Sequence, residues 1–272
     1  MSALALPFAF ALSIATALPF QYARASEPAQ VSAPTVVKVG VIPGAHAQIM
    51  EEVRRVAASQ GLTLDVVVFD RPENIDSALA AKQIDAASFE DGPSLDAQRN
   101  QHGYPLTSVA TTVTFPIALY SRKLTNLAQL QRGATIAIPD DAEGTSRALI
   151  LLQNFTLLTF KDSAGLHAKL GDITSNRLKL KIRRAPRAKL FDTLNSVAFA
   201  VIDSDDAARA GLYPARDGLG IEDARSPYAN VLTVRDADRA QPWVSQLVAA
   251  YHSNDVAHFI LTFYQDSVRR PW

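Results

Sequence analysis

The feature that most constrains the fold of this chain is a regular alternation of strand-like and helix-like segments after residue 35. Residues 36–42 (VVKVGVI) are an apolar run typical of a strand, and Pro43 and Gly44 interrupt it before a helical pattern at 48–58. The same order continues with a strand, a short helix and another strand at 64–69, 75–83 and 84–89. This β-α-β-α-β order predicts a parallel sheet with right-handed crossovers.

A second α/β set follows a long extended segment at 106–121, in which Pro116 predicts a bend. The expected strands of the second set are at 134–139, 178–184, 197–204 and 229–236, with a helix at 146–155 and two helices at the end of the chain. We therefore expect an α/β protein with two lobes, each a mostly parallel sheet flanked by helices. Ligands of such sheets bind beyond the carboxyl ends of the strands, which predicts a ligand cleft between the lobes.

The domain boundaries follow from this layout. The first lobe is expected to comprise 36–115 plus 233–272, and the second lobe 116–232 with the hinge crossings. Residues 1–25 contain an apolar run that ends in Ala-Arg-Ala, which predicts a cleaved signal peptide and an exported protein. No Lys or Arg precedes that run, so an uncleaved N-terminal anchor is the alternative. Residues 26–35 are polar and contain proline, as in a flexible tether.

Composition and motifs exclude several functions. The chain has 27 basic and 27 acidic residues, so it has no electrostatic signature of nucleic-acid binding. It has no cysteine, which removes disulfides, thiolate metal sites and lipid attachment through cysteine. There is no GxGxxG, GxxxxGK[ST], GxSxG or HExxH, and no two of the five histidines have i,i+4 spacing. We expect no cofactor, no metal site and no catalytic residues, and an enzyme is the weakest class.

The most informative segment is 138–152 (IPDDAEGTSRALILL), which has a strand, an acidic turn and a helix start. Arg147 falls near the first turn of that helix, where the helix dipole does not favour a cation. An arginine there is expected to serve a carboxylate, for which its planar fork is suited. The carboxylate belongs either to the protein, at Asp140, Asp141 or Glu143, or to a ligand.

Taken together, these segments resemble a known family. VGVIPGAHAQIME, IDAASF, PIALYSRKLTNLAQLQRGATIAIPDD, RALILLQ, DSAGLHAKLGDIT, AVID and SPYANVL occur in order from residue 38 onward. The chain resembles the NlpA-type, methionine-binding lipoproteins of bacterial ABC importers. The resemblance implies a two-lobed periplasmic binding protein that closes on a free amino acid and delivers it to a membrane permease driven by an ATPase.

The resemblance also implies site residues. Arg147 matches the arginine that pairs with the ligand carboxylate. Asn230 matches the asparagine that binds the amino acid head group, and Phe89 matches an aromatic residue beside the side-chain pocket.

Other positions depart from the family pattern. Where the family usually has Gln-His and, shortly afterwards, a tyrosine, this chain has Glu90 and Asp91 followed by Gly-Pro-Ser at 92–94. Pro72 replaces another tyrosine, Asp140 and Gly144 replace asparagines, and residues 203–206 (DSDD) replace Asn-Gly-Asn-Tyr. The lipobox cysteine is absent too. Aromatic contacts favour a thioether, so their loss is expected to weaken methionine binding. Asp203 or Asp205 is expected to accept from the ligand ammonium. The acidic changes also suit a more cationic ligand.

The sequence thus predicts a monomeric, exported binding protein of an ABC importer, free in the periplasm unless its N-terminal segment is retained as an anchor. The expected ligand-binding residues are Arg147, Asn230, Phe89, Asp203, Asp205, Glu90, Asp91 and Asp140. The expected partners are an amino acid, a permease and its ATPase, with no nucleic acid and with membrane contact only through the permease or that anchor. Two alternatives remain open, a binding protein for a different polar or cationic molecule and a degenerate relative without transport function.

Overall fold

The computed structural model of the protein describes residue 1 and residues 36–272. The predicted signal peptide and tether fall on residues 1–35 and so, apart from Met1, lie outside the described residues. Among the helices that the structure describes, none has both the length and the hydropathy that a membrane span requires.

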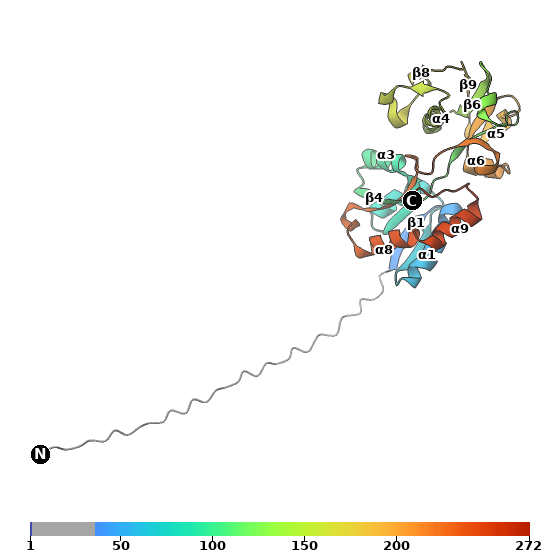
Figure 1. The fold of residues 1–272 in the computed structure, drawn as a ribbon. Helices are drawn as coiled ribbons and strands as arrows, with labels where there is room; N and C mark the ends of the chain where they lie inside the picture. Colours follow the sequence, from blue (N-terminus) through green and yellow to red (C-terminus); the bar gives the residue numbers. More distant parts are fainter. Residues whose placement is uncertain (2–35) are drawn as a thin grey trace. The chain divides into compact units, whose positions relative to one another are not determined.

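The first sheet has five strands in the order β2-β1-β3-β12-β4. β1 and β4 of this sheet are labelled in Figure 1. The strands are β1 (Val36–Val41), β2 (Thr63–Val68), β3 (Ala86–Asp91), β4 (Leu106–Thr111) and β12 (Asn230–Arg235). β1 is parallel to β2 and to β3, whereas β12 is antiparallel to both of its neighbours, β3 and β4. Four strands therefore share one direction, and the exception is the strand that returns from the second sheet.

The second sheet repeats this plan with the order β11-β5-β10-β6-β9. Its strands are β5 (Ile117–Tyr120), β6 (Thr135–Pro139), β9 (Lys181–Ala185), β10 (Phe199–Asp203) and β11 (Gly218–Ile221). Here β5 is the exception, antiparallel to β10 and β11, while β6 is parallel to β10 and β9. β5 is the first strand that the chain forms after it leaves the first sheet. The predicted α/β class with two mostly parallel sheets is confirmed.

Helices cover both sheets. The α-helices are α1 (Ala45–Ser59), α2 (Ile75–Ala80), α3 (Gly92–His102), α4 (Ala142–Asn154), α5 (Leu190–Thr193), α6 (Ser204–Arg209), α7 (Pro214–Asp217), α8 (Pro242–Tyr251) and α9 (Asn254–Tyr264). Short 3-10 segments occur at Pro72–Asn74, Leu127–Gln129, Asp162–His167, Leu170–Asp172, Arg187–Lys189 and Asp236–Asp238. β7 (Thr159–Phe160) pairs with β8 (Ile173–Ser175). The division into lobes at 115/116 and 232/233 stays a prediction. β12 belongs to the first sheet from Asn230 onward.

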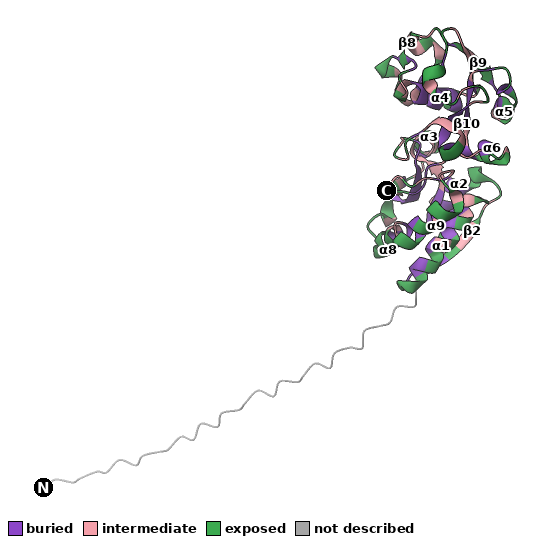
Figure 2. Ribbon diagram, turned by 45° about the vertical axis from the view of Figure 1, so that its right-hand side comes forward, coloured by how far each residue is buried: buried purple, intermediate pink, exposed green. Residues whose placement is uncertain are grey.

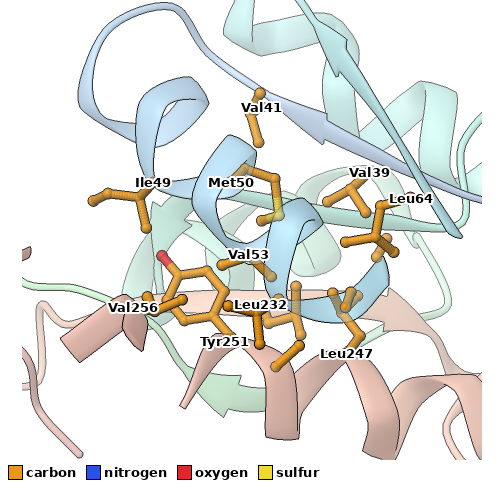
Figure 3. Close-up of a cluster of buried hydrophobic side chains, with 14 of the residues drawn as sticks. Val39, Val41, Ile49, Met50, Val53, Leu64, Leu232, Leu247, Tyr251 and Val256 are labelled. Carbon is orange, nitrogen blue, oxygen red and sulfur yellow. The ribbon is translucent and has the colours of Figure 1, made fainter. Parts of the chain in front are cut away.

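The core of the first sheet lies under α1. Met50 and Val53 of α1 point toward Leu247 and Tyr251 of α8 (Figure 3), and all four are buried. The outward faces of α8 and α9 are exposed (Figure 2). The second sheet has a separate core, in which Leu149 and Leu152 of α4 are fully buried. Each sheet is therefore stabilised by its own buried apolar layer.

Arg235, at the end of β12, is expected to stabilise the first sheet through buried hydrogen bonds. Its Nη1 donates to the carbonyl oxygens of Leu79, at 2.9 Å, and of Ile84, and its side chain is 10% exposed. Arg235→Met should lower the free energy of unfolding by about 1–3 kcal/mol for each carbonyl left without a donor. Urea denaturation measures this. Arg239→Met, at an exposed position, is the control, and equal stability of the two variants would contradict the assignment.

Candidate ligand-binding site

The site is built on a buried ion pair between Arg147 and Glu222. Arg147 lies in the second turn of α4, and its Nε donates to Glu222 Oε1 at 3.0 Å while its Nη2 donates to Oε2. The two side chains are only 10% and 5% exposed. The arginine thus pairs with a protein carboxylate. The partner is none of the three acids considered from the sequence, Asp140, Asp141 and Glu143. It is Glu222, which lies in the crossing that leads back to the first sheet.

Glu222 also holds other segments in place. Its carboxylate accepts from the Ile117 backbone N–H at 3.2 Å and from Ser226 Oγ at 3.0 Å, and its backbone oxygen accepts from Arg269 Nη1 at 2.9 Å. Glu222 therefore joins α4, the start of β5, the returning crossing and the C-terminal segment. A buried carboxylate that accepts hydrogen bonds from several segments holds those segments in one geometry.

Among the described residues, these contacts leave one nitrogen of the Arg147 guanidinium, Nη1, free to donate to a ligand. Nη2 also donates to the Phe115 carbonyl at 2.8 Å, and the guanidinium carbon lies 5.0 Å from the centre of the Tyr228 ring. Across the described residues, Nη1 has no hydrogen-bond partner, and it is not a fully enclosed atom. Arg147 is thus held in a fixed orientation with one N–H edge able to serve a ligand anion.

Tyr228 connects this pair to a cavity of about 820 Å³. The wall of the cavity comes from α3, α4 and the 166–171 segment. It is formed by Pro93, Ser94, Ala97, Ala142, Glu143, Thr145, Leu166, His167, Ala168, Lys169, Leu170, Gly171, Arg184 and Tyr228. Helices of both sheets therefore line one cavity of mixed apolar and polar character, as small-molecule sites usually are. None of the eight predicted ligand-binding residues forms part of this wall, which excludes Arg147, Asn230, Phe89, Asp203, Asp205, Glu90, Asp91 and Asp140.

Asn230 and Phe89 meet where β12 pairs with β3. Asn230 is 8% exposed, and its Nδ2 donates to the Phe89 carbonyl and to Nε2 of His46, each at 3.3 Å. Phe89 itself packs at the edge of a buried cluster. His46 was not among the predicted site residues. The available signal was its place in the Pro-Gly-Ala-His turn after the first strand.

Glu90 lies beside Asp76 of α2. Neither Asp76 Oδ1 nor Glu90 Oε1, both buried, finds a donor within the described residues. Burial, together with the neighbouring Asp76, raises the pKa of Glu90 to about 9. The two carboxyl groups therefore share a proton near neutral pH.

The other predicted acids have local structural roles. Asp91 caps α3 by accepting from the Ser94 N–H at 2.8 Å, and Asp203 caps α6 by accepting from the Asp206 N–H at 2.8 Å. Burial raises the pKa of Asp203. Asp205 is exposed in the first turn of α6, and exposed Asp140 contributes its backbone oxygen to Arg184.

Asp141 has a double role at the start of α4. It caps the helix by accepting from the Gly144 N–H at 2.7 Å, and it forms a two-point ion pair with Arg187. That arginine lowers the pKa of Asp141 to about 2. Asp141 is therefore committed to positioning the helix that carries Arg147.

Comparison with known proteins identifies the class to which this fold belongs. Among solved structures, a periplasmic substrate-binding protein of an ABC transporter from Coxiella burnetii has a TM-score of 0.70 and 39% identity, covering 86% of this chain and 99% of that one. A nutrient-binding protein from Burkholderia cenocepacia, solved with bound methionine, has a TM-score of 0.69 and 38% identity, covering 86% and 98%. The class defined by the fold is thus that of substrate-binding proteins with two α/β sheets.

The family follows from sequence. The model of the NlpA lipoprotein family matches residues 37–272, and the chain belongs to that family. The D-methionine-binding lipoprotein MetQ of Escherichia coli is 38% identical over 226 residues, which cover 82% of this chain and 83% of the relative. Outer membrane lipoprotein 2 of Mannheimia haemolytica is 35% identical over 237 residues, covering 87% and 86%.

The Arg147–Glu222 pair predicts a large effect on stability. Glu222→Ala leaves a buried guanidinium without its partner and should cost about 3–5 kcal/mol of unfolding free energy. The neighbouring Asp223 forms an exposed ion pair with Arg225, with side chains 60% and 78% exposed. Asp223→Ala should leave the urea midpoint nearly unchanged, and equal losses in the two variants would contradict the assignment.

The Asp76–Glu90 pair predicts a pH dependence of stability. Because the folded-state pKa of Glu90 is raised to about 9, the folded protein retains a proton that the unfolded chain releases above about pH 4.3. Its contribution is fully present below that pH and is lost as the pH rises toward 9. In Glu90→Gln an amide N–H donates to Asp76, and the fall in melting temperature between pH 6 and 9 should become shallower. An unchanged slope would show that Glu90 ionises normally.

Proposed function

We propose that this protein is the exported substrate-binding component of an ABC importer and captures a free amino acid, methionine or a close analogue. The observation that carries the proposal is the fixed Arg147 guanidinium. Its Nη1 has no partner among the described residues, and its carbon lies 5.0 Å from the ring of Tyr228, which lines the cavity. A two-point buried pair with Glu222 preorganises this donor, so a ligand carboxylate does not have to immobilise it.

The proposed roles of the other residues follow their positions. Asn230 would bind the ammonium end of the ligand, and Phe89 would pack beside the ligand side chain. The family assignment and the methionine-bound Burkholderia structure support this class of ligand. Asp203, Asp205 and Asp140 are proposed to set the charge of the cleft rim, and Asp91 to shape the cavity through α3. Glu90, which pairs with Asp76, acts on the ligand only through β3.

Delivery requires partners. We propose that the ligand-bound protein docks on a membrane permease powered by an ATPase, that it works in the periplasm as a monomer, and that it performs no chemistry on its ligand. Binding to groups of both sheets would favour the closed form of the cleft, since contacts made in only one state shift the equilibrium toward it.

A different polar or cationic ligand is the second candidate. It is favoured by Ser94 on the cavity wall and Asp91 beside it, at positions where relatives are expected to have aromatic or imidazole groups. Compared with aromatic or imidazole groups, serine and aspartate offer a ligand less aromatic contact and more negative charge. A panel of lysine, arginine and ornithine, measured beside both enantiomers of methionine, separates the two candidates.

The direct test removes the ion pair without leaving a buried charge. Arg147→Met combined with Glu222→Met deletes both partners, which buried ion pairs often tolerate. Isothermal titration of refolded, ligand-free protein should show methionine affinity reduced by about 10- to 150-fold, the value of a hydrogen bond to a charged group. An unchanged affinity in a folded double variant would contradict the proposed role of Arg147.

A substitution at Ser94 is predicted to raise the affinity for methionine. Ser94→Tyr places an aromatic ring on the cavity wall, where a thioether sulfur gains about 0.3–1.5 kcal/mol from the contact. Methionine affinity should rise by up to about tenfold, while norleucine, which lacks the sulfur, should gain less. Ala97→Tyr on the same wall is the control for loss of volume. A fall in methionine affinity in Ser94→Tyr would place the ligand side chain elsewhere.

A further inference from the structure

The starting observation is the orientation of the Asn230 amide. Its Nδ2 faces two groups, the Phe89 carbonyl oxygen and the His46 Nε2, each at 3.3 Å. A carbonyl oxygen can only accept a hydrogen bond, so the amide nitrogen must face Phe89. In the described part of the chain Oδ1 has no partner, although it is not a fully enclosed atom. The free end of this side chain, which is 92% buried, is thus a hydrogen-bond acceptor.

His46 determines whether that orientation is stable. The ring contacts the Asn230 amide, the Phe115 ring at 4.9 Å and the backbone of Ser88, and none of these three groups carries a charge. His46 is 7% exposed, and burial lowers its pKa to about 4. A neutral imidazole has one acceptor nitrogen and one N–H. Because Nε2 faces an N–H donor, the proton belongs on Nδ1, a buried atom that has no hydrogen-bond partner among the described residues.

We propose that His46 is a positioning residue of the binding site. Its neutral ring accepts the second N–H of Asn230 and thereby directs Oδ1 toward the ligand, so that the site selects for a ligand ammonium group. This inference rests on the proposed function and specifies the ligand chemistry of the same site. A protonated ring would place a donor against a donor and release the amide to rotate.

The tautomer is the first test, and it does not depend on ligand binding. Long-range ¹H–¹⁵N spectra of the ¹⁵N-labelled protein should show His46 with a protonated Nδ1 and an unprotonated Nε2, unchanged from pH 7.5 to 5.5. The spectrum of His46→Gln identifies its signals among the five histidines. An Nε2–H tautomer, or an imidazolium in this range, would overturn the proposal.

The second test separates positioning from general stability. His46→Leu removes the acceptor, and His46→Gln supplies one again through its amide oxygen. Methionine affinity should fall about tenfold or more in His46→Leu, the value of a hydrogen bond to a charged group, and should largely recover in His46→Gln. The affinity for 4-(methylthio)butanoate, which lacks the ammonium group, should not change.

The outcomes are distinguishable. Parallel losses for methionine and for the analogue, or no recovery in His46→Gln, would overturn the positioning role. If the wild-type protein binds neither compound, the proposed function fails for these ligands, and the His46 tautomer still decides whether the ring orients Asn230.

Discussion

The Arg147–Glu222 ion pair is the interaction on which the rest of the site depends. Two buried charges on segments 75 residues apart are neutralised by two parallel hydrogen bonds. Taking such charges out of water costs more than a pair normally returns, so the geometry is kept only where surrounding groups satisfy it. Here Ile117, Ser226 and Phe115 supply those groups. The same bonds that neutralise the arginine also join the segments that cross between the two sheets.

The topology explains why this pair lies at the crossings. In each sheet the one strand of opposite direction is the strand that enters from the other sheet, β12 in the first and β5 in the second. Both entering strands begin beside the site, since Asn230 opens β12 and Ile117 opens β5. The C-terminal segment joins them, because Thr114 pairs with Arg269 and Thr112 accepts from Trp272 Nε1. The crossings are thus connected to the groups proposed to bind the ligand.

The fold was predictable from sequence because its signals are local. Alternating apolar runs gave the strands, and Pro116 marked the break between β4 and β5. Helix α3 was missed because GPSLDAQRNQH has little apolar periodicity. Its limits are set by caps instead, Asp91 at the start and Gly103, with φ +69°, at the end. The site was only partly predictable. Arg147 was identified, but its partner Glu222 is distant in sequence, and no local pattern distinguishes Glu90, which faces α2, from Asp91, which caps α3.

The most direct measurement of the central claim is a crystal structure of the refolded protein with L-methionine. Our account predicts a ligand carboxylate oxygen within hydrogen-bond distance of Arg147 Nη1, with the Glu222 pair intact, and the ligand ammonium against Asn230 Oδ1. A carboxylate bound at Arg184 or Lys169 of the cavity wall, or a ligand that displaces Glu222 from Arg147, would contradict it.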